Sequence, residues 1–248
     1  MKAGSKVVWS VAIAGVLGFA SNGLAQVSMT LTTPTGYSAS YPNDVFAGVY
    51  VDPYVATVNG VANVPVICDD FLDDTAVGAT WQATVLNGST QFSQSRMYAF
   101  AGATQAQYEQ VAWLAEQLMT YTGTSSAAQT ERDYISFALW SIFEPTAVST
   151  WLNNSILLYG VTTSDITAIN GWVTAAQANA TAADLSNITI YSPCVGSKSC
   201  SGPKNSVPAQ EFIVVSPDAP AIETLGLNLL ALGALVFLAR KRIMVWAR

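Results

Sequence analysis

Residues 46–68 have the sequence FAGVYVDPYVATVNGVANVPVIC, and this stretch decides the β part of the fold. Val, Thr and Tyr alternate with small or polar residues on both sides of Asn59-Gly60. An Asn-Gly pair between two such runs indicates a two-residue hairpin turn, because both residues accept the positive φ that this turn needs. We therefore expect a hairpin in which Phe46 to Val58 pairs with Ala62 to Cys68.

The hydrophobic pattern changes twice along the chain. Residues 26–103 alternate in the manner of strands, whereas residues 104–183 place apolar side chains three and four positions apart, as helices do. Residues 184–216 return to the strand pattern, with strands expected over Leu185–Tyr191 and Ala209–Val215. Helices inserted between two groups of antiparallel strands are typical of an α+β fold, and residues 26–216 are enough for one compact domain.

Caps and breakers place the expected helix ends within residues 104–183. Thr104 is a suitable N-cap for the first helix, and Pro145 should end the second helix at Glu144, because an interior proline removes a backbone hydrogen bond. A third helix is expected from Ser164 to Ala182, capped by Thr163 or Ser164. Four apolar residues at helical spacing are expected in the core: Trp113, Leu114, Trp140 and Phe143.

The first 25 residues have the pattern of a secretory signal peptide. Lys2 and Lys6 precede the apolar stretch Val7 to Ala20, and the small residues in Gly23-Leu24-Ala25 suit a cleavage site before Gln26. We expect export through the Sec translocon and removal of the segment by signal peptidase. Cleavage after Ala20 and a retained N-terminal anchor are the alternatives.

Residues 217–248 have the pattern of a short membrane anchor. The apolar run Leu225–Ala239 stops at Arg240-Lys241-Arg242. A helix over about 221–239 would nearly cover a hydrocarbon core about 30 Å thick. Basic residues stay on the cytoplasmic side, so a transmembrane helix here would place residues 26–216 outside the membrane. A buried core helix is the alternative.

A proline motif, Pro217-Asp218-Ala219-Pro220, precedes this apolar run. Together with the short helix and the basic end it resembles the PEP-CTERM sorting signal of exported Gram-negative bacterial proteins. That signal has a Pro-Glu-Pro motif, so Asp218 would stand for the glutamate and Pro220 lies one position late. The resemblance implies transient anchoring in the inner membrane and cleavage by an exosortase-type membrane peptidase. The product would remain at the cell surface or in an extracellular matrix of exopolysaccharide.

The part expected to be exported is strongly acidic. Between residues 26 and 216 there are fourteen Asp and Glu residues, and the four basic residues are Arg96, Arg132, Lys198 and Lys204. Such a surface repels phosphate backbones, which excludes nucleic acid as a partner. The chain has no histidine, the commonest general base, and no serine-hydrolase or phosphate-loop motif. The composition therefore favours a protein that is not an enzyme and uses no cofactor.

Two of the three cysteines lie close together. Cys194 and Cys200 enclose a five-residue loop in which the backbone can turn at Gly196, so we expect a disulfide between them in an oxidising compartment. A zinc site lacks ligands, since there is neither histidine nor a second cysteine pair. Cys68 is left over and is expected to be a buried or half-buried thiol.

The segment Cys68–Asp74 is the most suggestive cluster of polar residues. It carries four carboxylates, which are Asp69, Asp70, Asp73 and Asp74. Carboxylates of this density are typical ligands of calcium, but the spacing does not fit an EF-hand loop and no glycine supplies its sharp turn. We expect a solvated strand end whose charge discourages pairing with another chain. A calcium site and a pair of acids for glycoside hydrolysis are the alternatives.

Three segments resemble the thioester domains of bacterial surface adhesins, namely Val66-Ile67-Cys68, Val111-Ala112-Trp113-Leu114 and Phe137-Ala138-Leu139-Trp140. In that family a strand cysteine is joined to a Gln side chain four residues before the Trp of a Gln-x-Ala-Ile/Leu-Trp motif. The position four before Trp140 is Ser136, whose hydroxyl cannot supply the acyl group, and Gln129 lies seven residues further upstream. The resemblance covers roughly residues 65–144. It implies the fold and places Cys68 and Ser136 at the thioester positions without the cross-link.

These observations favour an exported cell-surface or extracellular-matrix protein with a non-catalytic binding or structural role. The competing functions are a thioester-type covalent adhesin that uses Cys68 and an exported glycan-active enzyme.

Overall fold

The computed structural model describes residues 24–33, 44–51, 53–193 and 210–215. The expected signal peptide, sorting motif, transmembrane helix and Cys194–Cys200 disulfide lie outside these residues. Within the described ranges, no helix has the length and apolar character needed to span a membrane.

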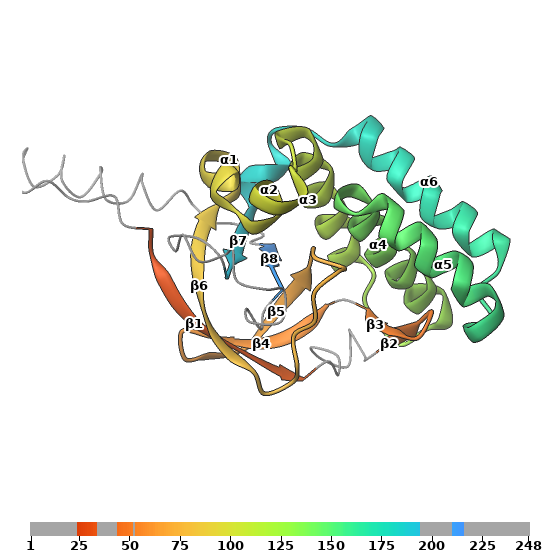
Figure 1. The fold of residues 1–248 in the computed structure, drawn as a ribbon, viewed down its shortest axis with the longest axis horizontal. Coiled ribbons are helices and arrows are strands. Elements are labelled where there is room, and N and C mark those ends of the chain that lie inside the picture. The colour runs from red at the N-terminus through yellow and green to blue at the C-terminus, as the bar shows by residue number, and fades with distance from the viewer. Residues whose placement is uncertain (1–23, 34–43, 52, 194–209, 216–248) are drawn as a thin grey trace, which may run out of the picture.

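Six antiparallel strands close into a barrel in the order β1-β4-β5-β8-β7-β6 (Figure 1). The strands are β1 (Gln26–Thr33), β4 (Tyr54–Val58), β5 (Val61–Cys68), β6 (Thr80–Asn87), β7 (Ile188–Ser192) and β8 (Phe212–Val215). Met29, Ala56, Val66 and Phe212 are among the buried residues of its apolar core. Closure pairs every barrel strand on both sides, so the barrel presents no sheet edge.

The Asn59-Gly60 hairpin is confirmed, but its first strand is shorter than expected. Asn59 and Gly60 both have positive φ, at 49° and 82°, and join β4 to β5. The residues expected to extend that strand towards Phe46 form a second hairpin instead, between β2 (Asp44–Phe46) and β3 (Val49–Val51). Ala47 and Gly48 turn the chain there with φ of 52° and 81°. A second positive-φ turn therefore divides the expected single strand.

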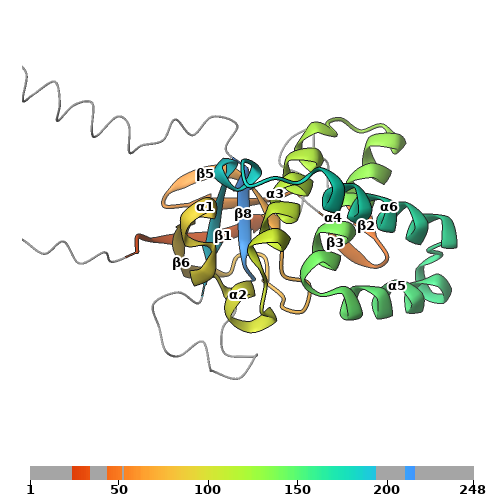
Figure 2. The same cartoon turned by 90° about the horizontal axis from the view of Figure 1, so that it is seen from above.

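The helices lie beside and above the barrel, as the two views show (Figures 1 and 2). The elements are α1 (Gly88–Gln91), α2 (Arg96–Ala101), α3 (Gln105–Thr120), α4 (Ser126–Phe143), α5 (Pro145–Tyr159), α6 (Thr163–Asn179), and the 3-10 turns η1 (Phe92–Gln94) and η2 (Asp184–Asn187). Helix α4 packs against α3, α5, α6 and the β2–β3 hairpin. This arrangement confirms an α+β fold of antiparallel strands with an inserted helical part.

The helix caps agree with the sequence in part. Thr104 caps α3 in a capping box with Gln107, as expected of this residue. Helix α4 ends at Phe143, one residue before the expected end, but Pro145 then begins α5, which was not expected. Proline is favoured in the first turn of a helix, because the N–H that it lacks has no partner there. Helix α6 is capped by Thr162 and not by Thr163 or Ser164, the two expected caps, and it ends at Asn179 instead of Ala182.

The main core lies between the helices and the barrel. Leu114, Trp140 and Phe143 are buried in it, as their spacing predicted, whereas Trp113 is half-buried at its margin. Phe71 packs against Trp140 with ring centroids 5.3 Å apart and the ring planes tilted by 42°. The loop that carries Phe71 therefore reaches from the end of β5 into the helical part.

Candidate functional site

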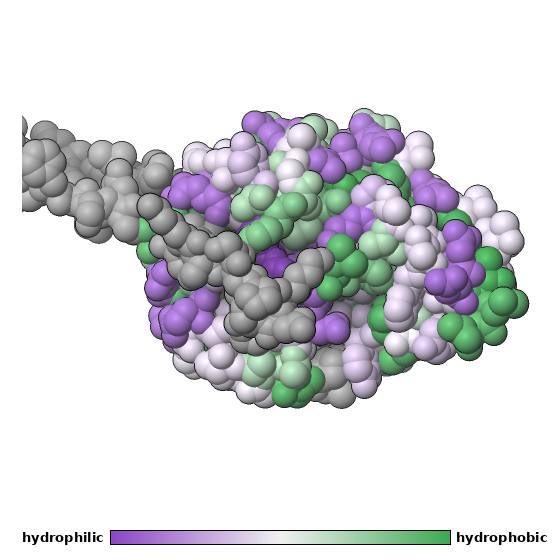
Figure 3. Space-filling view, viewed as in Figure 1, coloured by the Kyte–Doolittle hydropathy of each residue, from purple (hydrophilic) through white to green (hydrophobic). Residues whose placement is uncertain are grey.

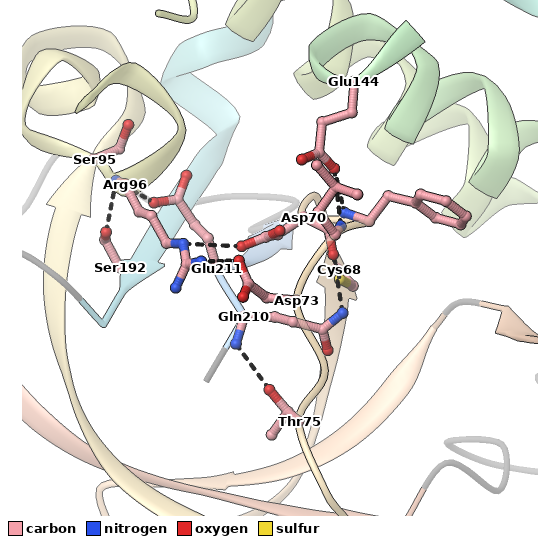
Figure 4. Close-up of polar contacts among 12 residues, drawn as sticks. Cys68, Asp70, Asp73, Thr75, Ser95, Arg96, Glu144, Ser192, Gln210 and Glu211 are labelled. Atoms are coloured by element: carbon pink, nitrogen blue, oxygen red, sulfur yellow. Dashed lines mark hydrogen bonds and ion pairs between the residues drawn. The ribbon is translucent and has the colours of Figure 1, made fainter. Parts of the chain in front are cut away.

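The loop at residues 69–75, which follows β5, is held from three sides (Figure 4). We call it the acidic loop. Glu144, the C-cap of α4, accepts hydrogen bonds from the backbone N–H groups of Phe71 and Leu72 at 2.6 and 3.1 Å. Arg96 at the start of α2 forms ion pairs with Asp70, at 3.0 Å, and with Asp73. Gln210 fixes the far end of the loop.

Gln210 makes two hydrogen bonds to the acidic loop. Together with Glu211 it lies directly before β8. Its side-chain amide donates to the backbone carbonyl of Asp70 at 2.9 Å. Its backbone N–H donates to the hydroxyl of Thr75 at 2.8 Å. Strand β8 pairs with β5 next to the loop, with Phe212 opposite Cys68. The closing strand of the barrel thus brings Gln210 and Glu211 to the acidic loop.

The expectation of a solvated strand end is wrong for Asp69 and Asp70. Their relative exposures are 0% and 1%. The expectation failed because the loop folds inward between the barrel and the helices, where Arg96 pairs with one of the two carboxylates. A buried charge needs such a partner, since the interior does not solvate it as water does.

Asp69 lies against a second buried acid, Glu211, which is also 0% exposed. Burial raises the pKa of Asp69 well above its ordinary value, and the nearby charge of Glu211 raises it further. Burial also raises the pKa of Glu211, but hydrogen bonds from Tyr108, Ser192 and the backbone N–H of Arg96 oppose that rise. No N–H or O–H donor of the other described residues reaches the carboxyl oxygens of Asp69. A proton held by Asp69 and donated to Glu211 accounts for both observations.

Glu211 accepts more hydrogen bonds from protein groups than Asp69 does. The Tyr108 hydroxyl donates to one of its oxygens at 2.7 Å, and the backbone N–H of Arg96 donates to the other at 2.7 Å. Ser95 forms a further short hydrogen bond with Tyr108. Burial, followed by the charges of Glu211 and Asp69, raises the pKa of Tyr108, so its hydroxyl keeps its proton and remains a donor. These hydrogen bonds therefore stabilise the ionised form of Glu211 more than that of Asp69.

Asp70 has a different environment from Asp69. Burial raises its pKa to about 7, Arg96 lowers it, and the charges of Glu144 and Glu211 raise it again. Its backbone carbonyl accepts a hydrogen bond from the thiol of Cys68, whose sulfur lies 3.2 Å away. Asp70 also lines a pocket, so it connects the buried network to the surface.

This pocket has a volume of about 510 Å³ and lies where the barrel meets the helical part. Its lining residues include Leu31, Tyr50, Tyr54, Asp70, Phe71, Asp74, Trp140, Gln210 and Phe212. A pocket of this size that combines aromatic rings with a carboxylate of raised pKa is the kind of place where small ligands bind. It is the candidate functional site.

Cys68 and Ser136, the positions suggested by the thioester resemblance, are both fully buried. Trp140 donates its indole N–H to the backbone carbonyl of Cys68 at 2.8 Å, so strand β5 and helix α4 meet at this point. Ser136 lies one turn before Trp140 on the same helix. The expectation that Cys68 is a buried thiol is confirmed.

The carboxyl groups of the four aspartates of the acidic loop do not point to one common position. Asp69 faces Glu211, Asp70 and Asp73 pair with Arg96, and Asp74 lines the pocket. Among the residues that the structure describes, no group of three or more His, Cys, Asp or Glu side chains is arranged to hold a metal ion.

Little in the local sequence pattern indicates the partners of the acidic loop. Arg96, Glu144 and Glu211 belong to three elements far apart in the chain, and only the tertiary fold brings them together. One signal was present for Arg96. A rare basic residue in a strongly acidic domain is expected to pair with carboxylates if it is buried.

A second surface feature is the apolar end of α5, where green residues gather at the right of Figure 3. Leu157 and Leu158 are 91% and 72% exposed there, and no residue of α5 is charged. Exposed apolar groups of this kind are typical of contact surfaces.

Comparison with protein-family models, with curated proteins and with solved structures finds no significant match to this chain. The function must therefore be inferred from the residues and their geometry.

Proposed function

We propose that this chain is an exported protein that is held briefly in the inner membrane by its C-terminal tail and then cut near Pro217 by an exosortase-type peptidase. The product stays at the cell surface or in an exopolysaccharide matrix, where it has a non-catalytic binding or structural role.

The observation that carries this proposal is the position of the barrel between the two expected cleavage sites. Strand β1 begins at Gln26, where signal peptidase is expected to cut, and Gln26 already pairs with Thr84. Strand β8 ends at Val215, which pairs with Ile188 and lies two residues before Pro217. Removing both ends would leave every strand pair of the barrel in place. This is what a passenger domain released from a temporary anchor requires.

The state of the buried acids supports a non-catalytic role. Burial and then the charge of Glu211 raise the pKa of Asp69, and Asp70 and Asp73 are paired with Arg96. A glycosidase needs two carboxyls that face each other across a bound sugar, one protonated and one ionised. Among the described residues, Asp69 and Glu211 come nearest to that division of roles, but both are 0% exposed, so a bound sugar does not reach them.

One observation favours a second candidate, the thioester-type adhesin. The contact between Trp140 and Cys68 joins the strand and the helix that such a domain would use. Because Ser136 has no acyl group to donate, we propose that the relationship is one of fold alone. Intact-mass measurement of the purified protein should then show no loss of ammonia. A loss that methylamine reverses would establish the adhesin chemistry instead.

The proposal is tested by replacing Pro217 and Asp218 together with Ala in the native host. The variant should accumulate at full length, apart from its signal peptide, in the inner membrane, because the peptidase no longer recognises the motif. Pro208→Ala, a proline change outside the motif, should be processed normally. Normal release of a shortened form from the double variant would contradict sorting by an exosortase.

A further inference from the structure

The pocket described above is lined by four parts of the structure. The barrel supplies Leu31, Tyr54 and Phe212, the helical part supplies Trp140, and the acidic loop supplies Asp70 and Asp74 among others. The β2–β3 hairpin contributes Gly48 of its turn and Val49 and Tyr50 of β3. Tyr50 and Val77 of the lining are 47% and 53% exposed, so the pocket reaches the surface. Its volume of about 510 Å³ falls within the ordinary range of small-ligand sites.

The charges in the lining argue against an anionic ligand. No described residue of the lining is basic, whereas Asp70 and Asp74 are acidic. The residues expected to be exported also carry a large excess of acids, so the field of the whole domain repels anions.

The same charges favour a cation only weakly. The carboxylate of Asp70 is already paired with Arg96 at 3.0 Å, and Asp73 pairs with the same guanidinium. A cationic ligand near Asp70 would therefore be repelled by Arg96 and would compete with it for the same carboxylate. Burial raises the pKa of Asp70 to about 7, which weakens its negative charge further. A neutral ligand avoids both difficulties.

Three aromatic side chains of the lining, those of Tyr54, Phe71 and Trp140, are held by other residues before any ligand arrives. Tyr54 donates its hydroxyl to the backbone carbonyl of Tyr50 at 2.7 Å. Trp140 is held by its bond to Cys68, and Phe71 lies between Trp140 and Trp151 with ring centroids at 5.3 and 6.0 Å. Rings held in this way lose little side-chain entropy on binding, so their contacts contribute more fully to affinity.

The polar groups of the lining complement the rings. Asp74 is an exposed carboxylate, and Thr75 and Gln210 add a hydroxyl and an amide. Acceptors and donors beside apolar ring faces suit a ligand that is apolar on its ring faces and carries hydroxyl groups around its edge. A hexose ring is such a ligand, because its C–H groups form apolar faces and its hydroxyl groups project from the edge.

We propose that this pocket binds the neutral hexose units of a polysaccharide. The inference rests on the proposed function in one respect, since an exported matrix protein would meet such a chain. The rings of Tyr50, Tyr54 and Phe71 stack on the sugar, while Asp74 and Gln210 hydrogen-bond its hydroxyl groups.

The test uses the full-length chain, purified in a detergent without a sugar headgroup so that the detergent does not compete. Calorimetric titration is carried out with cellotetraose, mannotetraose and galactotetraose, and separately with an oligogalacturonate and with choline. At least one neutral oligosaccharide should bind with a dissociation constant of about 1 mM or tighter, the range of a weak specific site. Oligogalacturonate and choline should bind at least about tenfold more weakly.

Two variants locate the binding in the pocket. Tyr50→Ala and Asp74→Asn should each weaken it by about tenfold or more, because the first removes a stacking ring and the second a charged acceptor. Tyr98→Ala is the matched control. Tyr98 is 44% exposed, close to the 47% of Tyr50, but it lies on α2 outside the pocket lining. It should bind like the unmodified chain.

Three results would overturn the proposal. They are no binding of any neutral oligosaccharide to a chain that melts cooperatively, tighter binding of choline or oligogalacturonate, or binding of a neutral oligosaccharide that neither pocket variant weakens.

These results concern the purified chain, so they leave the sorting proposal standing. Conversely, failure of the Pro217 and Asp218 experiment leaves the pocket proposal standing. Release of new reducing ends would support saccharide binding and contradict the non-catalytic role.

Discussion

Trp140 of α4 donates its indole N–H to the backbone carbonyl of Cys68 at the end of β5, over 2.8 Å. The bond is buried and joins the helical part to the barrel. One turn later on the same helix, Glu144 binds the backbone of Phe71 and Leu72. The acidic loop is therefore fixed by the end of α4, and the geometry of the pocket depends on this junction.

Replacing Trp140 with Phe should test this junction. The ring is retained in part, but the Cys68 carbonyl loses its buried donor, so we expect the free energy of unfolding to fall by about 1–3 kcal/mol. Trp172→Phe is a matched control, because Trp172 also donates its indole N–H, to Glu131 at 2.9 Å, but from a half-buried position. Its loss should be smaller. Equal losses in urea denaturation would contradict the special role of the Trp140 bond.

The buried acids predict that the protein is more stable in mild acid than at neutral pH. Burial raises the pKa of Asp69 and Asp70, so between the unfolded and folded values the folded state binds more protons than the unfolded state. The contribution of these two carboxyl groups to the unfolding free energy is fully present below their unfolded pKa of about 3.8. It is lost as the pH rises through their folded pKa values. For Asp70 that window runs from 3.8 to about 7, and the loss is roughly 4 kcal/mol.

The same sign holds for Asp69, because burial and then the charge of Glu211 raise its pKa well above the ordinary value. Asp69→Asn keeps the shape but removes this titration, so its stability should fall less steeply with rising pH. Thermal melting across the range measures both curves. A melting temperature that stays flat or rises from about pH 5 to pH 8 in the unmodified protein would contradict the raised pKa values of Asp69 and Asp70.

A side chain at Gly48 should displace the ring of Tyr159. The φ of Gly48 is +81°, and a Cβ atom there would overlap that ring. Gly78 has nearly the same φ, +84°, with nothing within 4 Å of its Cβ position, so Gly78→Ala measures the backbone cost alone. We expect Gly48→Ala to lower the unfolding free energy by about 1 kcal/mol more than Gly78→Ala, because the ring of Tyr159 is 54% exposed and can move aside. Adding Tyr159→Ala should restore part of that difference, and equal effects of the two glycine changes would contradict the close approach of Tyr159.

The basic end of the tail is expected to fix its orientation. Replacing Arg240, Lys241 and Arg242 with Ala removes the charges that stay in the cytoplasm, so part of the protein should lose its normal topology. External protease should then cut residues 26–216 in a smaller fraction of molecules in spheroplasts. Unchanged protease accessibility would show that the triplet does not set the topology.

Local patterns predicted the parts of the fold that depend on neighbouring residues. Asn59-Gly60 specified a hairpin, and Thr104 specified a helix start, because turns and caps are formed within a few residues. The division at Ala47-Gly48 was missed, since its strands look like one alternating run. Helix α5 was also missed, because Pro145 both ends one helix and begins the next.

Of the residues around the candidate site, the sequence pattern singled out only the acidic loop and the neighbouring Cys68. Asp69, Asp70 and Cys68 stood out as a cluster, but their burial depends on Arg96 and Glu211, which come from α2 and from the segment before β8. Barrel closure, with Phe212 paired to Cys68, joins segments far apart in the chain. Such pairings leave no local signal in hydrophobic spacing.

The most direct test of the central proposal is the intact mass of the protein isolated from the envelope and matrix of its native host. The mass should correspond to a chain that begins at Gln26 and ends near Pro217, allowing for any group attached at the new end. If the envelope and matrix hold no such form, and the cytoplasm yields a chain that keeps residues 1–25 and 217–248, export on a temporary anchor is contradicted.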